Sequence, residues 1–338
     1  MSLEVLWFLL IGVLLAGYAV LDGFDLGVGI LHPFVRGDRE RRLAINSIGP
    51  LWDGNEVWLV TFGGALFAAF PEAYATVFSG FYLPFMALLA ALIGRAISIE
   101  FRSKVASRWW RGYWDMSFAL SSFVAVLLFG VAAGNMIQGI PVGSDKEFAG
   151  SVLDLLGIYP LAVGVLAVAA SALHGALYLH LKTEGALQRE VGAWRWPAFG
   201  IFIAAYMLVT IMTLVRVPRV VENFERWPAM WSVVVLTVLA VASIPRGIVK
   251  GQPGLAFVGS SATILALVFT FGMALYPNLV VSSLDPAWDI SIQDAASSKS
   301  TLALMRNIAF IGLPFVLTYT GIVYWVFRGK VELDDFSY

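Results

Sequence analysis

The chain contains no cysteine among its 338 residues and only three histidines. The absence of cysteine excludes a disulfide framework, a thiolate metal site and the covalent attachment of a c-type haem. Charge is also scarce, because only 13% of the residues are charged, about half the share found in a soluble domain. The formal net charge is −1, so the composition indicates no nucleic acid or other polyanionic partner.

Hydrophobic residues make up 59% of the chain and the mean hydropathy is +0.81, which indicates a polytopic membrane protein. A helical span needs about 20 apolar residues, and a span must satisfy its own backbone hydrogen bonds. The sequence shows no ten-residue alternation of the barrel type, so we expect an all-α fold. The first apolar run lacks the features of a signal peptide and is expected to be retained. The nine predicted spans are 5–27, 53–71, 76–98, 117–139, 152–179, 198–216, 229–245, 255–278 and 306–327.

The positive charges between the predicted spans indicate an orientation. With nine spans, 16 of the 22 lysines and arginines fall on one side of the membrane and 6 on the other. Lysine and arginine accumulate in cytoplasmic loops. This split predicts that the N-terminus lies outside and that the C-terminus lies in the cytoplasm.

Asp22 and Asp25 lie near the cytoplasmic end of the first predicted span. They are three residues apart and share a helix face. Gly23 and Gly27 form a small-xxx-small pair that permits a neighbouring helix to approach closely. The pattern fits two carboxylates buried in a helix interface, where one could hold and pass a proton. It equally fits two acids that are solvated at the membrane surface or that cap a neighbouring helix.

Asp53 and Glu56 repeat this spacing at the start of the second predicted span, with Trp58 close behind them. Carboxylates are favourable at the positive end of a helix, and tryptophan is common at membrane interfaces. These acids therefore fit a helix start as well as a proton-handling site, and for Trp58 the interfacial role is favoured.

A third charged group follows the third predicted span and contains Glu100, Arg102, Lys104 and Asp115. Alternating donors and acceptors could relay protons from bulk water. The charge pattern alone favours a solvated loop whose basic residues fix the orientation.

The three histidines do not form a metal-binding pattern. His174 and His180 are six residues apart, which places them on different faces of a helix, and His32 precedes a proline at the end of the first span. Haem or metal ligation is disfavoured for all three, which leaves a proton relay or hydrogen-bonded packing as their role.

Several motifs, dense over the first 140 residues, closely resemble subunit II of the cytochrome bd quinol oxidases. The motif around the first acid pair reads LDGFDLGVG, and the one around the second includes GPLWDGNEVW. In the second half of the chain the resemblance is mainly topological, although the stretch around Tyr319–Trp325 is also similar. The matching segments are 21–29, 46–59, 63–71, 78–82, 101–104, 114–115 and 134–141.

The resemblance implies a haem-free second subunit of a membrane complex that oxidises quinol and reduces O2 to water. Haems b and d belong to the larger subunit I, and small single-span accessory subunits and membrane lipid are further partners. The implied fold has two four-helix bundles and a peripheral helix, which divides the chain into 1–140, 141–282 and 283–338. The implied location is the cytoplasmic membrane of a prokaryote. The family also allows a structural quinone, but no residue here indicates one.

The resemblance also implies roles for individual residues. Trp58 matches an aromatic residue near the entrance of an oxygen tunnel that leads to haem d. The expected residues of a route for protons from the cytoplasm are Asp22, Asp25, Asp53, Glu56, Glu100, Lys104 and Asp115.

Two other functions are compatible with these acids. A secondary transporter or ion channel is disfavoured, because transporters commonly place acids near the midplane on symmetry-related broken spans, whereas these acids gather at one face. In a purely structural scaffold the acids would be inert, and only experiment distinguishes that role from proton transfer.

Overall fold

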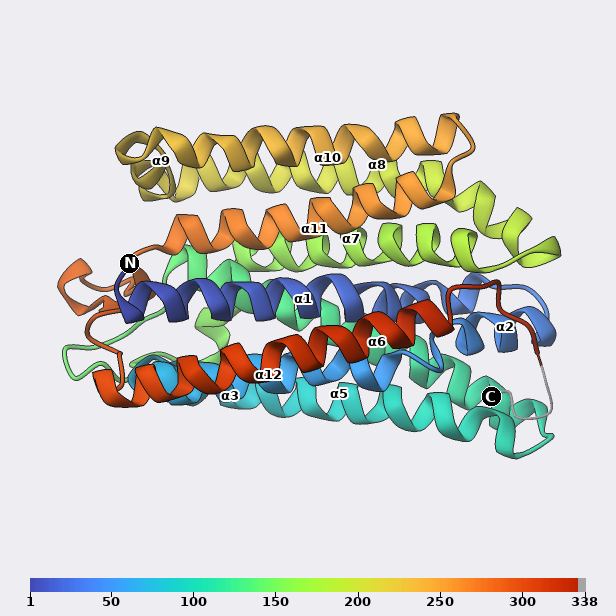
Figure 1. Ribbon diagram of the computed structural model, residues 1–338, viewed down its shortest axis with the longest axis horizontal. Coiled ribbons are helices and arrows are strands. Elements are labelled where there is room, and N and C mark those ends of the chain that lie inside the picture. Colours follow the sequence, from blue (N-terminus) through green and yellow to red (C-terminus); the bar gives the residue numbers. More distant parts are fainter. Residues whose placement is uncertain (334–338) are drawn as a thin grey trace.

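In the computed structural model, which describes residues 1–333, long helices run side by side along the molecule (Figure 1). Within the described residues, eight helices are long and apolar enough to cross a membrane. They confirm the expectation of a multi-pass helical protein. These helices are α1 (Leu3–Leu31), α5 (Tyr82–Phe101), α6 (Arg108–Gln138), α7 (Ile158–Lys182), α8 (Gly185–Arg216), α10 (Trp231–Val249), α11 (Pro253–Leu275) and α12 (Lys299–Val326).

The second predicted span, 53–71, forms α3 (Trp52–Ala69), which is not among the eight. Asp53, Asn55 and Glu56 occupy its first two turns and lower its hydropathy. The count of nine spans is therefore not confirmed. The remaining α-helices are α2 (Asp38–Ile48), α4 (Pro71–Gly80) and α9 (Glu222–Arg226), and the antiparallel strands are β1 (Asn278–Val280) and β2 (Ile290–Ser291).

The third predicted span, 76–98, is divided between two helices. α4 ends at Gly80 and α5 begins at Tyr82, with Phe81 buried between them in a non-helical conformation. Pro84 lies in the first turn of α5, where a helix needs no N–H donor. The apolar run continues through this break, so hydropathy alone could not reveal it.

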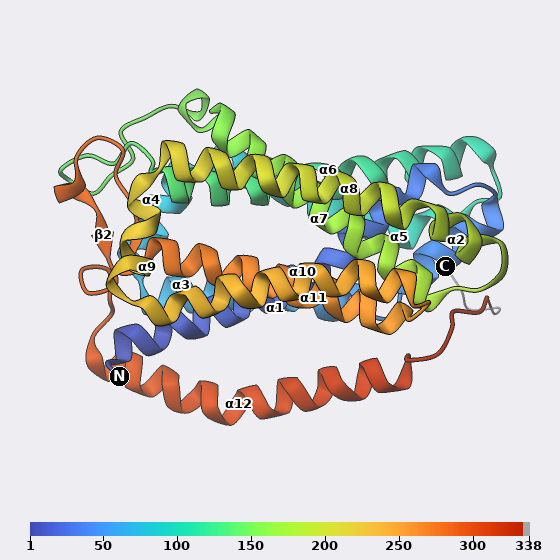
Figure 2. The ribbon, with the colours of Figure 1, turned by 90° about the horizontal axis from the view of Figure 1, so that it is seen from above.

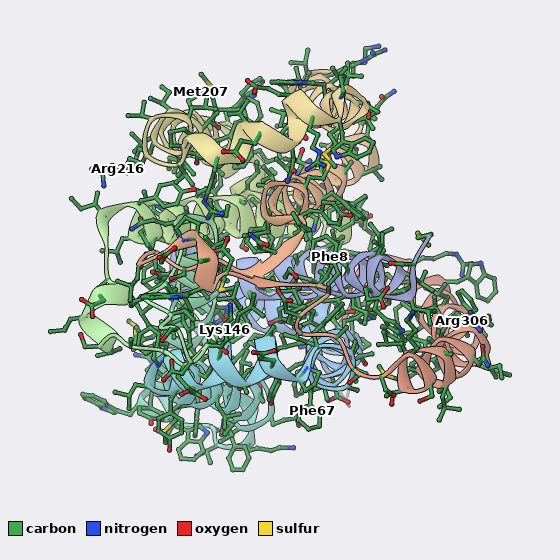
Figure 3. All side chains as sticks on the ribbon, turned by 90° about the vertical axis from the view of Figure 1, so that its left-hand side faces the viewer. Phe8, Phe67, Lys146, Met207, Arg216 and Arg306 are labelled. Atoms are coloured by element: carbon green, nitrogen blue, oxygen red, sulfur yellow. The ribbon has the colours of Figure 1, made fainter. Side chains whose placement is uncertain are left out.

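α1 is the central helix and contacts α3, α6, α7 and α11. α8 packs on α7 and α10 packs on α11, both on the side away from α1, whereas α12 runs along the outside (Figures 1 and 2). The N-terminus, α9 and the strands lie at one end of the bundle, which Figure 3 views with Lys146 and Arg216 in front. At the opposite end are α2, the turn from α5 to α6 and the C-terminal part of the described chain (Figure 1).

α1 and α7 cross with almost no space between their backbones. A Cβ atom added to Gly27 would lie 1.9 Å from the backbone oxygen of Ser171 and 2.9 Å from the backbone nitrogen of Gly175. The predicted close approach at Gly27 is therefore confirmed. At Gly23 the same atom would make only an ordinary contact with His174, 3.8 Å away. This crossing fixes the last turns of α1, which carry Asp22 and Asp25.

α12 packs loosely along its length, and Leu302 is its one buried residue. Hydrogen bonds instead fasten it at both ends. At the N-terminal end the Trp7 indole donates to the carbonyl of Leu302 at 3.0 Å. At the other end Lys182 donates to the carbonyls of Phe327 and Gly329, and Lys330 donates to carbonyls at the end of α7. The last residues of the predicted third unit, 334–338, lie outside the described residues.

Candidate functional site

Asp22, Glu56 and Arg95 form a buried ion-pair cluster between α1, α3 and α5. The Arg95 guanidinium donates from Nη1 to Asp22 Oδ1 at 2.5 Å, and its Nη2 lies 3.3 Å from Glu56 Oε2. The side chains of Asp22 and Arg95 have no exposed surface, whereas that of Glu56 is 22% exposed. The cluster therefore joins a fully buried carboxylate to one that reaches towards the surface.

Asp25 lies one helical turn beyond Asp22 and is equally buried. The side-chain amide of Asn55 donates to Asp25 Oδ2 at 2.7 Å and to the carbonyl of Leu21 at 3.1 Å. The Tyr324 hydroxyl of α12 donates in turn to Asn55 Oδ1 at 2.9 Å. The two acids of α1 therefore have different partners, one a guanidinium and the other a neutral amide.

This first cluster contains more carboxyl groups than cations and leaves several polar atoms unpaired. Asp22 and Glu56 share the guanidinium of Arg95, whereas Asp25 has no ion pair among residues 1–333. Among residues 1–333, the buried atoms Asp22 Oδ2, Asp25 Oδ1, Tyr18 Oη and Arg95 Nε have no hydrogen-bond partner. Unpaired buried polar atoms cost about 1–3 kcal/mol each unless water or a proton satisfies them. These atoms lie together on α1 and α5, so they mark a place suited to water and protons.

Asp115 is the centre of a second cluster. Its carboxylate accepts from Arg102 Nε at 2.5 Å and from Arg41 Nη1 at 2.9 Å, and its Oδ1 lies 2.6 Å from His32 Nε2. Arg102 also donates to Asp38 at 2.9 Å, and Arg111 donates to the same carboxylate at 2.8 Å. Three guanidiniums thus face two carboxylates.

The second cluster corrects the interpretation of the third charged group as a solvated loop. Asp115 lies within α6 and Arg102 is 1% exposed, so neither belongs to a solvated loop. Lys104 is exposed and Glu100 is half-buried. Neither of them takes part in an ion pair among residues 1–333.

The first two acid pairs also have definite places. Asp22 and Asp25 are fully buried, so the alternative of solvated acids is wrong for this pair. Glu56 joins their cluster, whereas Asp53 is exposed in the first turn of α3. Trp58 is buried instead of lying at an exposed interfacial position, and its ring covers Gly17 of α1.

The sequence interpretation missed the cations and amides that complete both clusters. Arg95 lies inside the predicted span 76–98. That position was itself a signal, because charges within apolar segments usually face a partner or water. Asn55 and Tyr324 carried no comparable signal, since their contacts depend on how α3 and α12 pack.

His174 and His180 are hydrogen-bonded to protein groups. The His174 ring stacks on Phe257, and its nitrogens lie 2.7 Å from Ser260 Oγ and 3.1 Å from the carbonyl of Val20. His180 Nδ1 donates to the carbonyl of Gln188 at 3.3 Å. Within residues 1–333, no group of three or more His, Cys, Asp or Glu side chains could hold a metal ion.

Comparison with known proteins adds to this geometry. Residues 3–327 match the family described as cytochrome bd terminal oxidase subunit II. The chain is 36% identical to cytochrome bd-I ubiquinol oxidase subunit 2 of Escherichia coli, with 98% of this chain and 96% of that protein aligned. It is 34% identical to cytochrome bd ubiquinol oxidase subunit 2 of Bacillus subtilis, with 98% and 97% aligned.

The fold has a solved relative in the structure of bd oxidase from Geobacillus thermodenitrificans. The TM-score is 0.79 at 17% sequence identity, and the match covers 97% of this chain and 99% of that one. The two chains therefore share a fold. On the family match and on the two relatives, this protein belongs to the family of cytochrome bd terminal oxidase subunit II.

Proposed function

We propose that this chain is the haem-free second subunit of a quinol-oxidising, O2-reducing complex and that it delivers protons from the cytoplasm. The observation that carries the proposal is the buried cluster of Asp22, Asp25, Glu56 and Arg95, in which carboxyl groups outnumber cations. The larger partner, subunit I, holds haems b and d and the site where quinol and O2 react. This division of labour agrees with histidines that bond to protein groups.

The proposed topology has nine spans, with α3 as the ninth. α3 contacts α1 and α12, and its apolar second half continues into α4. The spans form two four-helix bundles, within 1–140 and 141–282, and α12 is the peripheral helix of 283–338. The distribution of lysine and arginine supports an N-terminus outside and a C-terminus in the cytoplasm. In this orientation both clusters lie at the cytoplasmic end.

The proposed route begins at groups near solvent and ends at buried ones. Asp53, Glu100 and Lys104 collect protons at the cytoplasmic mouth, where Asp53 and Lys104 are exposed. Glu56 passes them inward to Asp22 and Asp25, whose unpaired oxygens accept ordered water or a proton. Asp115 holds the helices of the mouth together through its ion pairs.

The proposal also includes access for O2, assembly and lipid contact. Trp58 is buried between α1 and α3 with its ring against Gly17, and the proposal assigns it to the lining of the oxygen entrance. The exposed apolar side chains of α3, α5 and α12 suit contact with subunit I, single-span accessory subunits and lipid. A structural quinone is also part of the family's pattern, but no residue among those described identifies a site for it.

The test replaces one acid at a time in the assembled complex. Asp25→Asn and Asp53→Asn remove a proton carrier at nearly constant volume, and Glu225→Gln serves as a control at the exposed opposite end. We expect both aspartate variants to slow quinol-driven O2 consumption while haem content stays at the wild-type level. Wild-type rates in both variants would refute the proton route.

The alternative of a transporter or channel makes a different prediction for purification. An oxidase subunit is recovered with a larger, haem-bearing chain, whereas a transporter is recovered without one. Recovery of this chain alone and free of haem, under conditions that preserve membrane complexes, would contradict the proposal.

A further inference from the structure

Tyr324 is unusual among the side chains of α12. Its neighbours Ile322 and Trp325 are 56% and 64% exposed, as expected for a peripheral helix. Tyr324 instead reaches between the helices, and its hydroxyl donates to Asn55 Oδ1 at 2.9 Å. It is therefore the point at which α12 meets the first acid cluster.

The amide of Asn55 can adopt only one useful orientation. Its two N–H groups donate to Asp25 Oδ2 and to the Leu21 carbonyl, and its oxygen accepts from Tyr324. A flipped amide would point its oxygen at two other acceptors, which is unfavourable in a buried site. The Tyr324 hydroxyl occupies the remaining position with a donor, so all three contacts support the same orientation.

We propose that Tyr324 is a positioning residue for Asp25, acting through Asn55. Hydrogen bonds from Trp7 hold α12 at one end, and hydrogen bonds from Lys182 and Lys330 hold the chain at the other end. The position of the Tyr324 hydroxyl is therefore fixed relative to Asn55. This arrangement holds the Asp25 carboxyl group in one place relative to its neighbours. The inference rests on the proposed proton route, in which a displaced Asp25 slows proton transfer.

Several charged, titratable or amide groups surround Asp25. They come from α1 and from four other helices. These groups are Asp22 on α1, Asn55 and Glu56 on α3, Arg95 on α5, Tyr178 on α7 and Tyr324 on α12.

The test uses Tyr324→Phe, which removes one oxygen, in the assembled complex with subunit I. Tyr319→Phe is the matched control, because Tyr319 lies on the same helix and is 64% exposed. The first measurement is the infrared band of the Asp25 carboxyl group, identified as the band that Asp25→Asn removes from the pH-difference spectrum. The second is quinol-driven O2 consumption as a function of pH.

We expect Tyr324→Phe to shift the Asp25 band, to change the pH profile and to slow turnover by about fivefold, the effect of one lost hydrogen bond. Tyr319→Phe should do none of these. Asn55→Ala should shift the same band, and adding Tyr324→Phe to it should have no further effect, because the two residues act in series. This second variant also tests the inference if Tyr324→Phe does not assemble.

Two results overturn parts of the reasoning separately. An Asp25 band that stays at its wild-type position in both Tyr324→Phe and Asn55→Ala refutes the positioning role. A shifted band together with wild-type O2 consumption in Asp25→Asn supports the positioning role but refutes the proton route.

Discussion

Replacement of Arg95 by methionine tests whether the first cluster is held by its one cation. Methionine keeps most of the side-chain volume but leaves Asp22 without the donor that now lies 2.5 Å away. Removing one partner of a buried ion pair costs about 3–5 kcal/mol, because an uncompensated charge remains. The cost falls on Asp22, which has no exposed surface, more than on Glu56, which is 22% exposed.

Restoring neutrality should recover much of this loss. Asp22→Asn alone leaves Arg95 with Glu56 as its partner, and Arg95→Met together with Asp22→Asn leaves a neutral pair. We therefore expect Arg95→Met to be the least stable variant and the double variant to be more stable than Arg95→Met. The coupling should exceed about 2 kcal/mol, at the upper part of the range for residues in contact.

The assay measures the yield of assembled, haem-containing complex and the temperature at which that complex unfolds, with the same scan rate for each variant. The order of the unfolding temperatures suffices, because unfolding of a large membrane complex is commonly irreversible. If the double variant unfolds below both single variants by the sum of their effects, the buried pair makes no specific contribution and the reasoning fails.

Two further predictions concern the packing that holds the site. Gly27→Ala should lower the unfolding temperature of the complex, because the new Cβ atom would lie 1.9 Å from the Ser171 oxygen and overpacking costs about 1–3 kcal/mol. The control is Gly12→Ala on the same helix, whose new Cβ atom meets no atom within 4 Å. This control should be neutral or stabilising by about 1 kcal/mol. Equal unfolding temperatures would contradict the close crossing. Lys330→Met should make the chain after α12 about fivefold more sensitive to protease, because the lost hydrogen bonds to the end of α7 contribute about 1 kcal/mol. The control Lys250→Met, at an exposed position, should leave cleavage unchanged. Equal cleavage of both variants would refute the stabilising role of the Lys330 hydrogen bonds.

The helices were largely predictable, because a membrane span requires a long apolar run and few other structures tolerate one. The break at Phe81 was not, since apolar residues continue on both sides of it and only the backbone conformation changes. α3 shows the opposite difficulty. The polar residues that suit α3 to line a buried site also lower its hydropathy, so its composition does not place it among the eight apolar helices.

The acids of the site were predictable, whereas most of their partners were not. Asp22 and Asp25 stand out because carboxylates are rare in apolar runs. The ion pair from Arg102 to Asp115 joins the turn after α5 to α6, and the pair from Arg41 to Asp115 joins segments 74 residues apart. Charge pattern cannot select among such pairs, because many cations gather at this end of the chain and each suits any nearby acid.

The two clusters differ in their balance of guanidinium and carboxyl groups, and this difference predicts different roles for them. Around Asp115, guanidiniums outnumber carboxylates and occupy both carboxylate oxygens, so a proton added there would displace favourable ion pairs. Around Asp25, carboxyl groups outnumber cations and an oxygen is left without a partner, so a proton added there relieves repulsion between like charges. A route for protons needs groups like Asp25, which can accept a proton favourably, whereas a stable cytoplasmic entrance needs groups like Asp115, which stay in ion pairs. We therefore expect conservative changes at Asp115 to affect mainly the assembly of the complex and changes at Asp25 to affect mainly its turnover.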